Sequence, residues 1–263
     1  MSTPPAPAYQ DPQGGFFDTQ KRRSFTVELV VIGAVIAALL GAATLLVQPL
    51  TRAIVAALPA AVDEKLAEVV SLSMAQEKRA SPFEQARVAR LFAEVLTAVP
   101  PEHRAYVATA TVVAIDNDTM NAMASPGGHV FVYTGLMDLA DDDGLRGVLA
   151  HEVAHAVYRH GLQGLVRSQL LNLGLAWLLG DVGELEKLVV GQGASLLSLA
   201  YSRAQEDECD GYALQLADAQ GWSLVGMVKL YRAFPESGAP ELLATHPDSA
   251  ERARRIEEHL ARR

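Results

Sequence analysis

The pentapeptide HEVAH at residues 151–155 limits the fold of this chain more tightly than any other stretch. Residues four apart lie on one face of an α-helix, so His151 and His155 can bind the same ion. Glu152 lies at the rim of that face, within reach of a water molecule held by the ion. Two neutral imidazoles with an open coordination position suit a catalytic zinc, and the carboxylate can take a proton from the water. The pattern predicts a metal-binding helix; the alternative is two histidines on a surface helix.

The residues around the pentapeptide also favour a helix. The aspartates at 141–143 supply an N-cap and a favourable charge at the helix N-terminus, and Gly161 stands where a C′ glycine is expected. Between these ends, apolar residues recur with helical spacing at positions 145, 148, 149, 153, 156 and 157. We therefore expect this helix to have a wide buried face.

Composition excludes several classes of protein. At 263 residues the chain can form one ordinary domain with accessory segments. Its formal net charge of −9, without any basic patch interleaved with aromatics, argues against a nucleic-acid partner. Cys209 is the only cysteine, so an intrachain disulfide is excluded.

The N-terminal region predicts attachment to a membrane. Residues 1–23 are rich in Pro, Gln and Gly, end in three basic residues, and are predicted to be a disordered cytoplasmic tail. Nineteen consecutive uncharged residues follow from position 29 to 47, which is the length of a membrane-spanning helix. We predict that residues 24–48 are a transmembrane signal anchor, with a cleaved signal peptide as the alternative. The basic flank places the N-terminus in the cytoplasm and the bulk of the chain outside the inner (plasma) membrane.

Residues 49–263 are predicted to form one α+β domain that is mainly α-helical. Helical signals cover 50–78, with a bend at Pro59, then 81–98, the metal-binding helix, two apolar segments within 164–200, and about 198–220. Residues 106–115 alternate and are β-branched, and two short segments at 121–124 and 129–133 follow after turns, so we predict a sheet of about three strands. A strand edge beside the metal could hold an extended peptide by backbone pairing, or the strands could only pack the helix.

A catalytic zinc needs a third protein ligand. Glu184 and Glu186 lie in a polar turn, where solvated charges are expected. Glu206 and Asp210 are one helical turn apart on a helix otherwise lined by small apolar residues. Glu206 could complete the zinc site, while Asp210 could accept the N–H of a ligating histidine and fix its tautomer.

Four motifs together resemble the M48 zinc metallopeptidases, the group that contains the HtpX membrane proteases. They are NAMASPGGHVFVYTGLM, HEVAHAVYRH, SRAQEDECD and the Thr-His-Pro around His246 with Arg252 downstream, in the order found in that family. The resemblance implies a zincin-like metalloprotease domain with one Zn²⁺ per chain. Carried over by position, it implies that His151, His155 and Glu206 ligate the zinc and that Glu152 is the general base.

The same resemblance implies roles for residues outside the ligand set. Asp210 would support a metal ligand, and His246 would stabilise the developing oxyanion. Asn121, Gly127 and Gly128 match the family's substrate-binding strand.

Three residues near the motifs receive no catalytic role. Cys209 stands where the family usually has alanine and is predicted to be a buried structural thiol. His160 lies nine residues past His151, on another helix face, and is assigned no ligand role. Glu208 is predicted to point away from Glu206 and to be solvated.

These observations predict a membrane-anchored zinc metalloendopeptidase. It would hydrolyse peptide bonds in misfolded or membrane-associated proteins, as part of envelope protein quality control, and would contact the membrane through its N-terminal helix. The alternative is a non-catalytic holdase or assembly factor that retains the peptidase fold. Intact catalytic positions favour the enzyme. The sequence makes no prediction of the oligomeric state.

Overall fold

A computed structural model describes residues 17–179, 201–233, 246 and 249–262. The chain divides into two compact units, Met1–Pro49 and Leu50–Arg263. The described part of the first unit belongs to helix α1 (Phe17–Ala57), which includes the predicted anchor and the last residues of the predicted tail. Within the described residues, no helix combines the length and the apolarity that a membrane span requires.

The second unit begins with the end of α1 and continues through three helical segments. These are α2 (Ala61–Ser73), the short 3₁₀ helix η1 (Met74–Gln76) and α3 (Pro82–Ala98). The bend predicted at Pro59 is a complete break between α1 and α2. The start of α3 follows the sequence prediction, because Ser81 and Glu84 form a reciprocal capping box.

The predicted three-stranded sheet is present. Its strands are β1 (Val112–Ile115), β2 (Ala122–Ala124) and β3 (Val130–Tyr133), in the order β1-β3-β2. β3 is parallel to β1 and antiparallel to β2. The first strand is shorter than expected, because its predicted beginning lies in the 3₁₀ helix η2 (Pro101–Val107) and in a turn closed by Ala110 N–H and the Val107 carbonyl.

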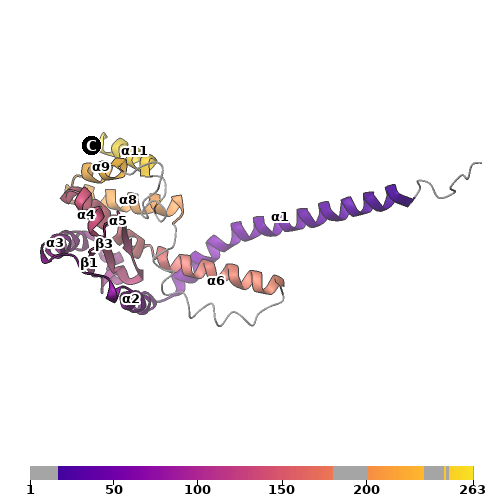
Figure 1. Cartoon of the computed structure of the whole chain (residues 1–263), viewed down its shortest axis with the longest axis horizontal. Helices are drawn as coiled ribbons and strands as arrows, with labels where there is room; N and C mark the ends of the chain where they lie inside the picture. Colours follow the sequence, from indigo (N-terminus) through magenta and orange to yellow (C-terminus); the bar gives the residue numbers. More distant parts are fainter. Residues whose placement is uncertain (1–16, 180–200, 234–245, 247–248, 263) are drawn as a thin grey trace, which may run out of the picture. The chain divides into compact units, whose positions relative to one another are not determined.

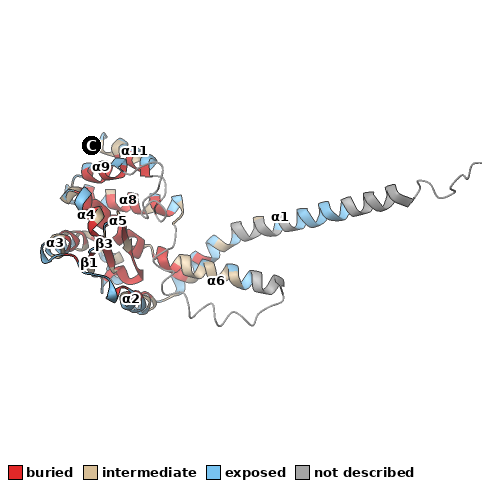
Figure 2. Cartoon of the chain, viewed as in Figure 1, coloured by how far each residue is buried: buried red, intermediate tan, exposed pale blue. Residues whose placement is uncertain are grey.

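Helix α5 (Asp142–Val157) carries the HEVAH pentapeptide and follows the short helix α4 (Thr134–Leu139). Its neighbours are α3, β2 and β3, together with α8 (Arg203–Gln220) and α9 (Val225–Ala233). Helix α11 (Ser249–Leu260) packs against α8 and α9. Figure 1 shows α5 between the sheet and the α8–α9–α11 layer, and Figure 2 shows that it is buried along most of its length.

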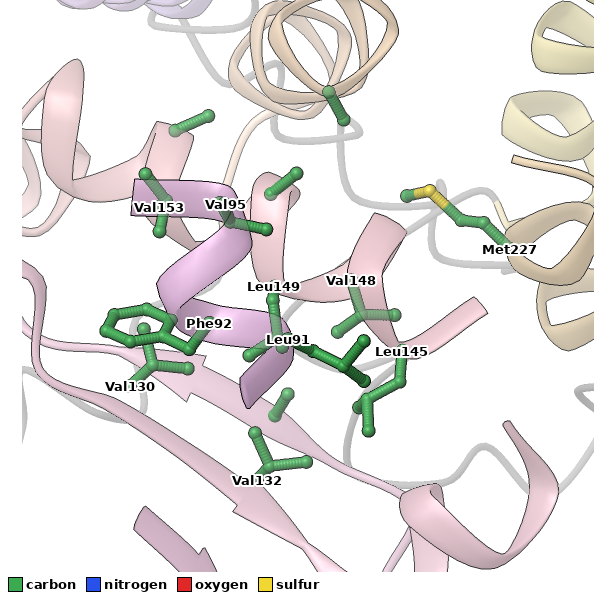
Figure 3. Packing of buried hydrophobic residues seen from close by; sticks show 14 of the residues in the cluster. Leu91, Phe92, Val95, Val130, Val132, Leu145, Val148, Leu149, Val153 and Met227 are labelled. Carbon is green, nitrogen blue, oxygen red and sulfur yellow. The ribbon is translucent and has the colours of Figure 1, made fainter. Parts of the chain in front are cut away.

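The core that holds α5 in place is aliphatic. Side chains of α3 pack between α5 and the inner face of the sheet (Figure 3). The residues at the centre of this contact are no more than 4% exposed: Leu91, Phe92, Val95, Val130, Val132, Leu145, Leu149 and Val153. All six apolar positions predicted to form the buried face of α5 are buried.

The two ends of α5 differ in how well the sequence predicts them. Asp141 is the N-cap, as expected, and accepts a hydrogen bond from Gly144 N–H at 2.8 Å. The prediction that Gly161 is the C′ residue is wrong. Helix α5 ends at Val157, and Gly161 lies inside the next helix, α6 (His160–Leu179). The left-handed residue between the helices is Arg159, with a φ of 58°.

Contacts of the Arg159 side chain offset the cost of that conformation, about 1–2 kcal/mol. Its guanidinium is buried and donates to the backbone carbonyls of Val55, Leu58 and Pro59. It also donates to Asp63 at 2.6 Å.

Helix α8 begins later than predicted, at the N-cap Ser202, and ends as expected before Gly221, whose φ is 70°. The first of the two apolar segments predicted as helices forms α6. The second, with Glu184 and Glu186, lies outside the described residues.

Candidate metal centre

Two buried helices bring the predicted metal ligands together. His151 and His155 project from one face of α5, and their Nε2 atoms lie 3.1 Å apart. Glu206 is in the first turn of α8, which packs against α5. Its carboxylate oxygens lie 3.3 Å from His151 Nε2 and 3.5 Å from His155 Nε2. All three residues are at most 2% exposed.

The spacing of these donor atoms fits one zinc ion. Ligand atoms about 2.0–2.2 Å from a tetrahedral zinc lie about 3.3–3.6 Å from one another. The three donor pairs measured above, at 3.1 to 3.5 Å, match that spacing. Two imidazoles and a carboxylate are also the ligand chemistry of catalytic zinc.

His246 joins this cluster from the segment before α11. Its Nδ1 lies 3.1 Å from both oxygens of Glu206 and 3.4 Å from His151 Nε2. Its Nε2 lies 3.6 Å from Glu152 Oε1. His246 can therefore reach both the metal site and the predicted general base, and its predicted role towards the oxyanion stays a prediction.

Glu152 is placed to exchange protons in this site. The residue is 1% exposed, and its Oε2 is buried without a hydrogen-bond partner among the described residues. Residues of α5, α9 and α11, together with His246, line a pocket next to this carboxylate. They are Val148, His151, Glu152, Tyr231, His246, Ser249 and Arg252. A buried acceptor that faces a pocket is available to a water molecule or a substrate.

Asp210 lies where a residue that orients His151 must be. Its Oδ1 is 3.0 Å from His151 Nδ1. A carboxylate only accepts hydrogen bonds, so His151 carries a proton on Nδ1, which leaves Nε2 as the atom that can bind a metal.

Arg252 is the largest side chain in the site for which sequence reasoning gave no role. It lies on α11 and is 1% exposed. Its guanidinium donates to both oxygens of Asp210, at 2.7 Å each, and lies 2.5 Å from Glu206 Oε2. It also donates to the Tyr231 hydroxyl and stacks over that ring, with its central carbon 4.5 Å from the ring centroid. Arg252 thus pairs with two buried carboxylates.

The charges of the site shift its pKa values. Burial and the Arg252 guanidinium oppose protonation of His151, but hydrogen bonds to Asp210 and Glu206 outweigh them and raise its pKa to about 9. Burial opposes ionisation of Glu206, yet His246 and His151 hold its pKa well below the usual range. Burial likewise disfavours the Asp210 anion, but Arg252 and His151 lower its pKa to about 2. Burial lowers the pKa of His155 well below its usual value.

Residues behind His155 correct two sequence predictions. His160 is fully buried, and its Nδ1 lies 3.1 Å from His155 Nδ1. Its Nε2 lies 3.1 Å from Glu208 Oε2, so Glu208 is turned towards the site and is only partly solvated, with 39% of its side chain exposed. The prediction that His160 faces away assumed one continuous helix, but the left-handed residue Arg159 turns the chain back.

Two more side chains complete the surroundings of His155. Cys209 is a buried free thiol, as predicted, with its sulfur 3.5 Å from His160 Nδ1. Burial raises its pKa, so it stays protonated. Tyr201 stacks on His155 with ring centroids 3.9 Å apart, a contact that no sequence signal indicated.

The predicted substrate-binding residues lie around β2, which is an edge strand of the sheet and contacts α5. Asn121 precedes β2 and is 1% exposed. Its Oδ1 has no hydrogen-bond partner among the described residues. Gly127 and Gly128 form a buried turn with φ values of 78° and 81°. The positive φ of Gly127 favours glycine there, and a Cβ at this position would also lie only 3.1 Å from Ala67 Cβ. The fold therefore accounts for this glycine without a role in substrate binding. The role in substrate binding stays a prediction.

Comparison with known proteins agrees with this geometry. Peptidase family M48 matches residues 82–260. Metalloprotease LoiP of Escherichia coli (strain K12) is 30% identical over 149 residues, which cover 54% of this chain and 59% of LoiP. Metalloprotease YcaL of the same strain is 27% identical over 183 residues, 67% of this chain and 68% of YcaL.

A third relative is a mitochondrial protein. Mitochondrial metalloendopeptidase OMA1 of Schizosaccharomyces pombe is 33% identical over 155 residues, which cover 56% of this chain and 45% of OMA1. The matched region thus spans less than two thirds of both LoiP and OMA1. The family match covers more than half of the chain and contains the whole donor cluster. The chain therefore belongs to peptidase family M48.

Proposed function

We propose that the chain is a zinc-dependent endopeptidase with one zinc per chain, held by His151, His155 and Glu206. The observation that carries the proposal is the combination of donor atoms at the spacing of a tetrahedral zinc with an adjacent buried carboxylate oxygen without a partner. The first feature supports metal binding, and the second supports proton transfer beside the metal.

The roles of the side chains follow from their positions. When bound, zinc supplies the Lewis acidity that polarises a peptide carbonyl and activates water. Glu152 takes the proton of the attacking water on Oε2 and delivers it to the amide nitrogen as the C–N bond breaks. His246, 3.6 Å from Glu152, donates to the oxyanion that develops on the carbonyl. Asp210 and Arg252 hold His151 and Glu206 in place.

The proposed substrates are misfolded or membrane-associated proteins of the cell envelope. An unfolded segment can pair with the edge of β2 beside α5, near Asn121, Gly127 and Gly128, since strand addition needs only backbone groups. Because backbone pairing tolerates many side chains, this geometry supports broad specificity.

We further propose that residues 24–48 anchor the chain in the inner membrane with its N-terminus in the cytoplasm. Described apolar side chains of α1 are 52–65% exposed from Val27 to Val35, and an apolar helix surface needs lipid or protein to cover it. Fractionation of cells that express the full chain tests this: it should sediment with membranes and resist alkaline extraction. Recovery of the intact chain in the soluble fraction would contradict the anchor.

Metal analysis of the purified full chain tests the zinc site. We expect about one zinc per chain in the wild type and a loss of most of it in Glu206→Ala, because two imidazoles alone hold zinc weakly. Glu251→Ala removes an exposed carboxylate from α11 and serves as the control. A wild type that stays metal-free after incubation with zinc would refute the site and favour the holdase.

Zinc binding is also expected to release a proton. The pKa of His151 is about 9 without metal, so the ring is protonated at pH 7–8 and zinc must displace that proton. Below pH 9, the apparent affinity for zinc should therefore fall about tenfold for each pH unit, as long as His151 is the only ligand that gains a proton. Calorimetry near pH 8, in two buffers with different ionisation enthalpies, measures the release as about one proton per zinc. A release of zero would show that His151 is neutral in the metal-free protein.

A further inference from the structure

His155, the second proposed ligand, is connected to a carboxylate through another histidine. His155 Nδ1 lies 3.1 Å from His160 Nδ1, and His160 Nε2 lies 3.1 Å from Glu208 Oε2. His160 is completely buried, whereas Glu208 reaches the surface, where it pairs with Arg52 at 3.2 Å. No other carboxylate is close to His155 Nδ1 among the interactions of the described residues.

The chemistry of these groups fixes the direction of each hydrogen bond. A carboxylate only accepts, so His160 must donate from Nε2 to Glu208. In a neutral imidazole the other nitrogen then carries the lone pair, so His160 Nδ1 accepts the proton of His155 Nδ1. His155 is left with its lone pair on Nε2, the atom that lies 3.1 Å from His151 Nε2 in the donor cluster.

We propose that His160 and Glu208 are positioning residues that hold His155 in its metal-binding tautomer and orientation. His151 is held directly by Asp210, and His155 is held through His160 by Glu208. The inference rests on the proposed zinc site. It assigns three acidic residues of α8 to separate tasks: Glu206 binds the metal, Glu208 orients His155, and Asp210 orients His151.

The rival explanation is a second metal ion. His155, His160 and Cys209 also bring donor atoms within reach of one another. That ion would need the Nδ1 atom of His155 while Nε2 binds the first metal, so the ring would have to lose both protons. It would also need a thiolate from Cys209, whose pKa burial raises. The hydrogen bonds from His155 through His160 to Glu208 require neither change.

Zinc affinity of the full chain, measured by competition with a chromophoric chelator, tests the proposal. His160→Leu fills the space but cannot bond, and it should weaken zinc binding about 10–100-fold. His160→Gln keeps one acceptor and one donor and should recover part of that loss. Glu208→Ala should also weaken zinc binding. Asp207→Ala is the control: it removes an equal charge from α8, but Asp207 pairs with Arg255 and takes no part in the hydrogen bonds from His155 to Glu208, so zinc affinity should not change.

Nitrogen NMR of ¹⁵N-histidine-labelled, zinc-loaded wild type gives a readout that needs no variant to fold. We expect protons on His155 Nδ1 and His160 Nε2. A proton on His160 Nδ1, or wild-type affinity in His160→Leu, would overturn the proposal. Two zinc ions per wild-type chain, with one lost in His160→Leu, would also overturn it and make His160 a ligand. A wild type without zinc would instead refute the proposed function.

Discussion

The Glu152→Gln variant is expected to keep one zinc per chain while its turnover of an unfolded protein substrate falls about 10²–10⁴-fold. Glutamine has the shape of glutamate, so the ligands on α5 and α8 should not move. Its amide oxygen cannot take up the proton of the attacking water, however. Parallel measurement of metal content and of kcat on the same preparation separates the two effects.

A matched substitution controls for the loss of charge. Glu251 is a carboxylate on α11 that pairs with Arg254 at the surface, and Glu251→Gln should leave kcat unchanged. If Glu152→Gln cleaves at the wild-type rate, Glu152 is not the base. If it loses its zinc, Glu152 contributes to metal binding, and the ligand set needs revision.

Replacement of Arg252 by methionine is expected to destabilise the fold by about 3–5 kcal/mol. The guanidinium lies between the buried carboxylates of Glu206 and Asp210. Methionine fills much of the space, but it removes the guanidinium that pairs with both buried carboxylates and leaves the His151 ring to offset their charge. Chemical denaturation of the metal-free chain measures the change in the free energy of unfolding.

Zinc should reduce that defect, because the ion supplies the missing positive charge next to Glu206 and stabilises the folded state by mass action. Arg254→Met, on the same helix, removes a guanidinium that is 53% exposed and should cost no more than about 1 kcal/mol. An Arg252→Met variant as stable as Arg254→Met would show that Asp210 and Glu206 do not depend on Arg252.

Local sequence signals predicted the elements that carry the site. The predicted N-cap among the aspartates at 141–143 gave the start of α5, and the predicted ranges 81–98 and 198–220 gave the start of α3 and the end of α8. Four-residue spacing placed His151 and His155 on one face, and it placed Glu206 and Asp210 on one face of α8. These inferences hold because a helix imposes its period on any sequence that forms it.

Contacts that depend on a turn or on a distant element could not be predicted. His160 was placed on the wrong face because nothing in the sequence shows that Arg159 adopts a left-handed conformation without glycine. Arg252 and Tyr231 approach the ligands from α11 and α9, and their spacing from HEVAH carries no periodic signal. The start of β1 was misplaced because Tyr106 and Val107, two residue types that favour strands, lie at the end of the short helix η2, where tertiary packing overrides propensity.

The hydrogen bonds of Arg159 define where an autonomous fragment of this protease can begin. Its buried guanidinium takes its acceptors from the chain between Val55 and Asp63. A truncation placed after those residues would remove no metal ligand, yet it would strip a buried cation of its acceptors at the junction of α5 and α6. The smallest fragment that keeps the candidate site intact should therefore start inside α1, upstream of Val55, although no proposed catalytic residue lies within the next sixty positions.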